Sequence, residues 1–218
     1  MTNLDDLEGL LHRGEKEKAY ELIKEDKGIT AKILINEGIR FGIIGNYNLS
    51  ISYFEFAGKI SVNNEIKAAA RENLVVAYYN RGTAFSELRR HEEAIENYNK
   101  AIVLGIEYIE AYNNRGAAYY KLNKLEKAIE DFNKAIEINP EYTPAYSNRG
   151  AAYLELKQHE KALEDCNKAI ELDPEDPEAY NNRGNAYRKS NVAPAHPTAA
   201  ELRGMTCRRF TTQFLFKF

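Results

Sequence analysis

The feature that most constrains this chain is an internal repeat with a period of 34 residues. Three residue types recur in one register: Tyr78, Tyr112, Tyr146 and Tyr180; Arg81, Arg115, Arg149 and Arg183; Gly82, Gly116, Gly150 and Gly184. A repeat of this length is typical of arrays of small supersecondary units, each of which buries its apolar face only by stacking on neighbours. The period therefore predicts a row of similar units.

Each unit has the pattern of two helices joined by a turn. In the clearest unit, Ala111–Pro140, apolar residues on both sides of Asn123–Lys124 follow the 3.6-residue spacing of a helix. We expect a first helix over 111–122 and a second over 126–138. Pro140 ends the second helix because proline cannot continue a helix without losing a hydrogen bond.

Several repeated residues have a structural interpretation. Gly116 and Gly150 stand where two helices are expected to cross closely. The arginine before each glycine is expected to pair with an acidic residue of an adjacent helix, such as Asp131 or Asp165. Cys166 takes the position that an aromatic residue holds in sister units, which predicts a core side chain.

The units resemble tetratricopeptide repeats (TPR). The resemblance rests on an aromatic residue, a glycine four residues later, a further aromatic, a small residue, an aromatic, an alanine and a closing proline, and it covers roughly 31–188. It implies an all-α fold, an α-solenoid of antiparallel helix-turn-helix repeats that form a right-handed superhelix with a concave inner face.

The register divides the chain into unequal parts. A ten-residue insert is rich in helix formers and predicts one long helix over roughly 64–88. The expected parts are a degenerate helical cap (1–30), a divergent repeat (31–64), the insert (65–74), three repeats (75–108, 109–142 and 143–176), a terminal half-repeat that forms a capping helix (177–189), and a basic, Phe-rich, poorly ordered tail (190–218).

Charge separates the repeats from the tail. The 218 residues carry a net charge of −3. From Lys189 onward there are five basic residues and one acidic residue, Glu201, which gives +4. The part before Lys189 therefore carries −7. A body that acidic argues against nucleic acid, whose binding depends on cationic neutralisation of phosphates. The longest uncharged stretch in the first half, 41–54, is too short and polar to cross a membrane.

Catalytic and metal-binding motifs are missing from the sequence. There is no phosphate-binding glycine loop, no G-x-S-x-G and no H-E-x-x-H. Two cysteines make no disulfide framework, and His91 and His159 lie two repeats apart, so we expect them to be solvent-exposed turn residues. We expect no enzyme, no cofactor, no metal and a cytoplasmic location.

An asparagine two residues before each repeat glycine is the main candidate for function. These asparagines are Asn36, Asn80, Asn114, Asn148 and Asn182, and the last four form the predicted site. In TPR proteins this face of the first helix lines the groove, and a side-chain amide can pair with both N–H and C=O of an extended peptide. By the same helical phase, Tyr79, Asn113, Tyr120 and Lys121 join the predicted site. The alternative is that the asparagines bind water or bond within the helix pair.

One function of the family is disfavoured by the residues present. TPR cochaperones hold a C-terminal carboxylate with lysines, asparagines and an arginine spread over three units. Here Asn114 matches the middle asparagine, but Tyr79 and Thr83 replace one lysine and asparagine, and Pro144 and Asn148 replace a lysine and the arginine.

The sequence therefore predicts a scaffold that binds a protein or peptide partner in its concave groove. The alternative is a structural, self-assembling module in which the repeat ends or the tail make a homo-oligomer.

Overall fold

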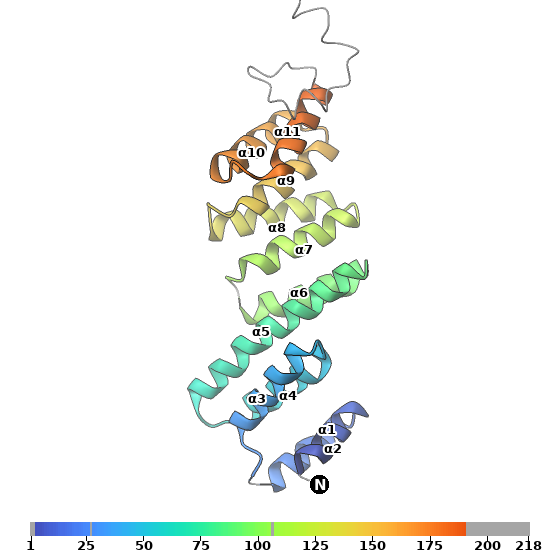
Figure 1. Ribbon diagram of the computed structural model, residues 1–218, viewed down its shortest axis with the longest axis vertical. Helices are drawn as coiled ribbons and strands as arrows, with labels where there is room; N and C mark the ends of the chain where they lie inside the picture. Colours follow the sequence, from blue (N-terminus) through green and yellow to red (C-terminus); the bar gives the residue numbers. More distant parts are fainter. Residues whose placement is uncertain (1–2, 27, 106, 191–218) are drawn as a thin grey trace, which may run out of the picture. The chain divides into compact units, whose positions relative to one another are not determined.

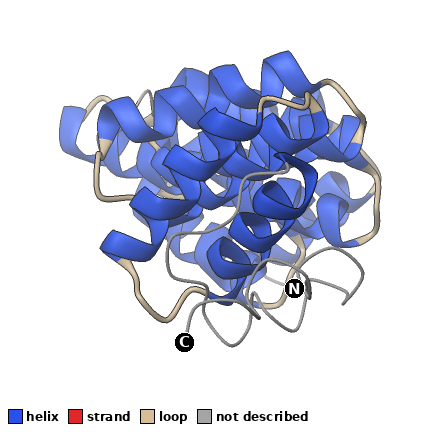
Figure 2. Ribbon diagram, turned by 90° about the horizontal axis from the view of Figure 1, so that it is seen from above, coloured by secondary structure: helices blue, strands red, loops and turns tan. Residues whose placement is uncertain are grey.

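The computed structural model describes residues 3–26, 28–105 and 107–190. Within these residues the chain forms eleven α-helices and no strand (Figures 1 and 2). The helices are α1 (Asn3–His12), α2 (Lys16–Glu25), α3 (Ala31–Ile43), α4 (Tyr47–Ile60), α5 (Asn64–Glu87), α6 (His91–Leu104), α7 (Ile109–Lys121), α8 (Leu125–Ile138), α9 (Thr143–Glu155), α10 (His159–Leu172) and α11 (Pro177–Ser190). The all-α prediction is confirmed. The predicted tail lies outside the described residues except for Ser190.

The chain divides into two compact units. Unit 1 is Met1–Ala111 and unit 2 is Tyr112–Phe218. In unit 1, α3 packs on α4 and α5 packs on α6; in unit 2, α9 packs on α10 and α11 packs against both. In α3–α4, α5–α6 and α9–α10, a first helix is thus paired with the second helix that follows it.

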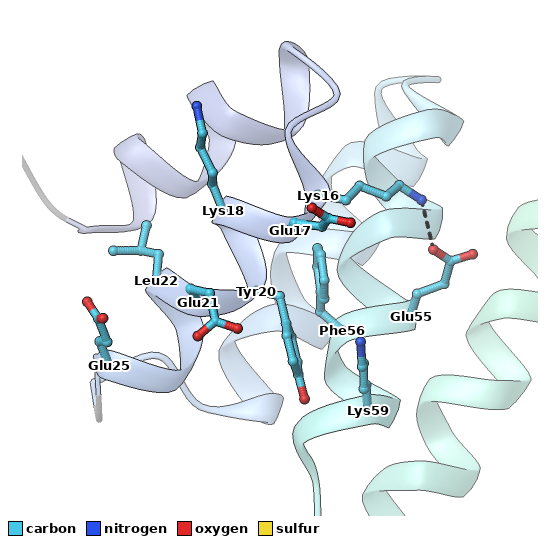
Figure 3. Close-up of a pocket in the computed structure, with 10 residues that line it drawn as sticks. All are labelled: Lys16, Glu17, Lys18, Tyr20, Glu21, Leu22, Glu25, Glu55, Phe56 and Lys59. Carbon is cyan, nitrogen blue, oxygen red and sulfur yellow. Dashed lines mark hydrogen bonds and ion pairs between the residues drawn. The ribbon is translucent and has the colours of Figure 1, made fainter.

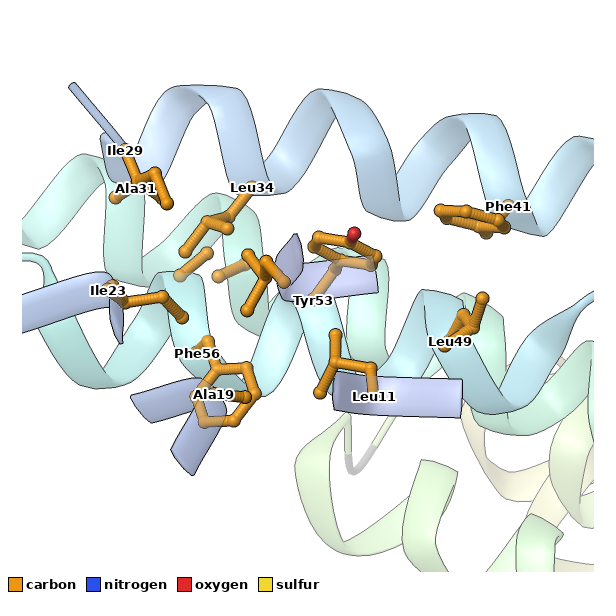
Figure 4. Packing of buried hydrophobic residues seen from close by; sticks show 13 residues of the cluster. Leu11, Ala19, Ile23, Ile29, Ala31, Leu34, Phe41, Leu49, Tyr53 and Phe56 are labelled. Atoms are coloured by element: carbon orange, nitrogen blue, oxygen red, sulfur yellow. The ribbon is translucent and has the colours of Figure 1, made fainter. Parts of the chain in front are cut away.

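The core of unit 1 joins the N-terminal helix pair to the divergent repeat (Figure 4). Leu7 of α1, Leu34 of α3 and Tyr53 of α4 are fully buried in one cluster. Phe41 stacks on Tyr53 with ring centroids 5.4 Å apart and planes 9° from parallel. Burial of large side chains contributes about 1.5–3 kcal/mol each, so this cluster ties α1 and α2 to the first repeat.

The ten-residue insert extends α5. Asn63 is the N-cap of this helix, because its Oδ1 accepts hydrogen bonds from the backbone N–H of Glu65 at 2.7 Å and of Ile66 at 3.2 Å. Ala70, inside the insert, is fully buried in the unit 1 core. The predicted long helix is confirmed by these bounds, with 24 residues.

The turns between paired helices pass through the left-handed backbone region. Gly45 has φ of 79°, and the non-glycine residues Arg89, Asn123 and Lys157 have φ of 56–59°. A positive φ is costly for residues with a Cβ, least so for asparagine. His91 and His159 follow such turns as the first residues of α6 and α10, and both are half-buried. The expectation that they are solvent-exposed is therefore wrong.

Candidate functional site

The predicted site residues lie on the first helices of the repeats. Tyr79 and Asn80 are on α5 in unit 1. The other six belong to unit 2: Asn113, Asn114, Tyr120 and Lys121 on α7, Asn148 on α9 and Asn182 on α11.

In unit 2, the arginine after each asparagine fixes its helix. Arg115 of α7 donates two hydrogen bonds to Asp131 of α8, at 2.8 and 2.6 Å. Arg149 of α9 does the same with Asp165 of α10, at 2.8 and 2.7 Å. Burial raises the pKa of Asp131, and the Arg115 guanidinium offsets part of that shift. Such two-point pairs restrict rotation of the first helix, as expected for structural arginines.

The asparagine side chains of unit 2 bond to one another from helix to helix. Asn148 Nδ2 donates to Asn113 Oδ1 at 3.0 Å, which joins α9 to α7. Asn113 Nδ2 donates in turn to Asn114 Oδ1 at 3.2 Å. The next level repeats the arrangement with a backbone acceptor, because Asn182 Nδ2 donates to the carbonyl oxygen of Ser147 at 3.2 Å.

Burial and bonding divide these amides into two kinds. Asn113 is only 6% exposed, and its Nδ2 and Oδ1 both have protein partners. Asn148 and Asn182 are half-buried, and each uses its Nδ2 in the bond described above. In the part of the chain that the structure describes, the Oδ1 atoms of Asn148 and Asn182 accept no hydrogen bond from protein.

Tyr120 and Lys121 lie at the C-terminal end of α7. Tyr120 is half-buried, and burial, with the negative charge of Glu155, raises the pKa of its phenol. The phenol therefore stays protonated and can donate a hydrogen bond at neutral pH. Lys121 is exposed, and its Nζ lies 5.8 Å from the Tyr120 ring centroid.

One polar contact near the amides was not predicted. Ser147 Oγ donates to Asp176 Oδ2 at 2.5 Å, and the other oxygen of Asp176 accepts from the N–H of Glu178 at the start of α11. The Asp-Pro pair before a helix is the signal that could have located this cap.

In unit 1, Tyr79 belongs to an aromatic cluster. Its ring lies 5.0 Å from that of Tyr108, edge to face, and 6.0 Å from that of Tyr98. Asn80 is half-buried and makes no side-chain hydrogen bond with any residue in the described ranges.

A hollow lies between α2 and α4 (Figure 3). Tyr20 stacks on Phe56 at 6.1 Å, and Lys59 Nζ lies 3.8 Å from the Tyr20 centroid. Lys16 is paired with Glu55 at 3.0 Å. The lining of the hollow contains four glutamates and three lysines, so the hollow does not select a ligand by charge.

The described residues give no geometric support for a metal site or for a reactive thiol. No three His, Cys, Asp or Glu side chains there are grouped to hold a metal ion. Cys166 is fully buried against Gly150, as predicted for a core side chain, and burial raises the pKa of its thiol to about 12. Across the same residues, no helix has the length and apolar character needed to cross a membrane.

Comparisons with known proteins agree with the repeat geometry. A family model described as tetratricopeptide repeat matches 109–142 and 143–176, a TPR repeat model matches 84–123, and a further tetratricopeptide repeat model matches 166–192. The solved first TPR of Spaghetti (RPAP3), bound to the HSP90 peptide SRMEEVD, is 30% identical, with a TM-score of 0.54 over 55% of this chain and 95% of that one. The chain belongs to the tetratricopeptide repeat family.

Two other solved structures are similar. The second TPR domain of human RPAP3, in complex with the HSP70 peptide SGPTIEEVD, is 27% identical, with a TM-score of 0.52 over 53% of this chain and 97% of that one. MamA is 27% identical, with a TM-score of 0.58 over 76% of this chain and 85% of its own. A search of curated protein sequences gave no significant match.

Proposed function

We propose that this TPR protein is a non-enzymatic scaffold that binds an extended peptide segment against the first helices of unit 2, α7, α9 and α11. Membership of the TPR family supports a role in protein binding. Two of the similar structures are of TPR domains in complex with peptides.

The observation that carries the proposal is the pair of Oδ1 atoms on Asn148 and Asn182 that accept no hydrogen bond from the described residues. Each amide is held by its own donor bond to the preceding first helix, so its Oδ1 has a fixed position before any partner arrives. Fixed groups lose little conformational entropy on binding. Two such oxygens, one repeat apart, suit the N–H groups of an extended backbone. Asn113, buried and doubly bonded, acts by positioning Asn148.

The residues present favour an internal segment over a chain end. The cochaperone pattern for a C-terminal carboxylate needs cations, but Pro144 and Asn148 replace them on α9. Tyr120 adds a neutral donor and a broad apolar surface at the end of α7. We therefore propose a partner whose backbone, not its terminal carboxylate, is recognised.

The test begins with a random-peptide display library selected on the full chain, which supplies a ligand for binding measurements. The variant Asn148→Ala/Asn182→Ala removes both acceptors. Two lost hydrogen bonds at about 1 kcal/mol each predict affinity weaker by tenfold or more. Asn64→Ala is the matched control, because Asn64 is an exposed asparagine at the start of α5 in unit 1 and makes no side-chain hydrogen bond with the described residues.

Helical circular dichroism and the melting temperature show whether each variant is folded. Unchanged affinity in the folded double variant contradicts the proposal. So does a selected peptide that binds only through a free C-terminal carboxylate. Equal losses in the double variant and in the control would also contradict it, because they would place the ligand elsewhere.

A further inference from the structure

The extension of α5 produces a hollow in unit 1, which we call the insert hollow. Its walls are Arg71, Glu72, Val75 and Val76 of α5, and Glu107 and Tyr108 from the segment that follows α6. Val76 is 48% exposed although it is aliphatic. The hollow thus offers an unfilled apolar surface beside charged groups.

Other first helices lack the elements that make this hollow. Arg71 and Glu72 belong to the ten-residue insert, which lengthens α5 beyond the start of the repeat at 75. The corresponding helices α7 and α9 begin at Ile109 and Thr143, near the start of their repeats. The insert hollow is therefore a departure from the regular repeat.

Arg71, the basic residue that lines the hollow, already has a structural partner. Arg71 Nε donates to the carbonyl oxygen of Leu104 at 2.8 Å, at the C-terminal end of α6. A cation there satisfies a helix-end carbonyl and interacts favourably with the helix dipole. Arg71 thus holds the C-terminal end of α6 against α5.

The two carboxylates of the hollow have no such partner. Glu72 and Glu107 are exposed, and neither forms an ion pair with any residue of 3–26, 28–105 or 107–190. The same lining contains the side chains of Val75 and Val76 and the Tyr108 ring. A complementary group therefore needs an apolar stem and a positive end.

We propose that the insert hollow binds an arginine or lysine side chain of a peptide partner. The methylene stem would lie on Val75 and Val76, as long basic side chains do on apolar surface. The cationic end would face Glu72 and Glu107, beside the ring of Tyr108. Tyr108 contacts Tyr79 edge to face, which links the hollow to the predicted site on α5. The proposal deepens the proposed function, since it assumes a peptide partner.

Small probes test the hollow without a known partner. The methyl signals of Val75 and Val76 are followed by NMR in the full chain as Nα-acetyl-arginine amide is added. Nα-acetyl-norleucine amide provides a stem of similar length without charge, and Nα-acetyl-glutamate amide reverses the charge. We expect saturable shifts of both valines with the arginine probe, and binding at least about fivefold weaker with the other two.

Charge-neutral variants complete the test. Glu72→Gln/Glu107→Gln is expected to weaken the arginine probe about fivefold. Glu141→Gln is the matched control, because Glu141 holds the position of Glu107 one repeat later. Absence of valine shifts, equal binding of norleucine, or insensitivity to the double variant overturns the proposal. Because these readouts do not involve Asn148 or Asn182, a failure here is distinct from a failure of the proposed function.

Discussion

Gly116 on α7 lies directly against the ring of Phe132 on α8. A Cβ atom placed at position 116 would be 2.7 Å from Cε1 of Phe132 and 3.1 Å from the carbonyl oxygen of Ala128. Both distances are shorter than ordinary van der Waals contact. The glycine is thus required by the close crossing of two helices, as its position in the repeat predicts.

Gly116→Ala is expected to destabilise the protein by about 1–3 kcal/mol, the usual range for overpacking. Helix propensity acts in the opposite direction by about 1 kcal/mol, so urea unfolding measures which effect is larger. Gly150 provides a graded comparison, because the nearest atom to a Cβ there would be Cys166 Sγ at 3.2 Å, with the carbonyl oxygen of Ala162 and the Cβ of Asp165 at 3.5 Å. We expect Gly150→Ala to cost less. Phe132→Cys leaves a cavity of its own, so the expectation for that background is that Gly116→Ala costs less there than in the parent. A more stable Gly116→Ala protein would contradict this account.

The chain contains its own comparison for the Arg115–Asp131 ion pair. In unit 1 the equivalent Arg81 donates to Asn97 Oδ1 at 2.7 Å, so a neutral amide occupies the carboxylate position. Asp131→Ala removes the carboxylate that accepts two hydrogen bonds from the half-buried Arg115 guanidinium, and we expect a loss on the order of 3 kcal/mol. Asp131→Asn should cost clearly less, since it recreates the Arg81–Asn97 pair. Equal losses for the two variants, measured by urea unfolding, would show that charge is essential.

Much of the fold is predictable from the sequence because each repeat uses local rules. The 3.6-residue pattern, the closing Pro140 and the helix-forming insert specify helices within a few residues of those observed. Gly116, Asp131 and Cys166 are predictable by comparison of one repeat with the next. These positions depend on contacts within one helix pair, which every repeat makes in the same way.

The candidate site is less predictable because its contacts join different repeats. In the neighbouring repeats, the position of Asn113 is occupied by Tyr79 and Ser147. Periodicity alone therefore does not indicate the hydrogen bonds of Asn113 to Asn114 and Asn148. The insert hollow depends on the path of the chain after α6. Tyr108 is 29 residues from Tyr79 in sequence, and only the fold shows their contact.

Lys157 is expected to be a poor residue for the turn between α9 and α10. Its φ of 59° lies in the left-handed region, where a Cβ adds about 1–2 kcal/mol of strain. Lys157→Gly removes that strain but adds backbone entropy to the unfolded state, so we expect a net gain of about 0.5–1 kcal/mol. Asn123→Gly is the control, because asparagine tolerates the same conformation and should gain less. A loss of stability in Lys157→Gly, measured by urea unfolding, would contradict this interpretation.

Cys166 is expected to make stability depend on pH in the alkaline range. Burial, and next the negative charge of Asp165, raises the pKa of the thiol to about 12 in the folded chain, from an ordinary value of about 9. The folded state therefore holds the thiol proton more tightly than the unfolded state. The thiol therefore contributes to the free energy of unfolding. This contribution is fully present below pH about 9 and is lost as pH rises from about 9 to about 12.

The measurement compares the parent with Cys166→Ala by urea unfolding between pH 7 and pH 11. At neutral pH the parent should be more stable, because the alanine leaves a cavity beside Gly150. Its advantage should shrink above pH 9, since the parent has the Cys166 thiol, which ionises more easily after unfolding, and the variant does not. Other alkaline groups titrate in both proteins, so they cancel in the difference. A constant difference across this range would show that the Cys166 thiol ionises as easily in the folded chain as in the unfolded one.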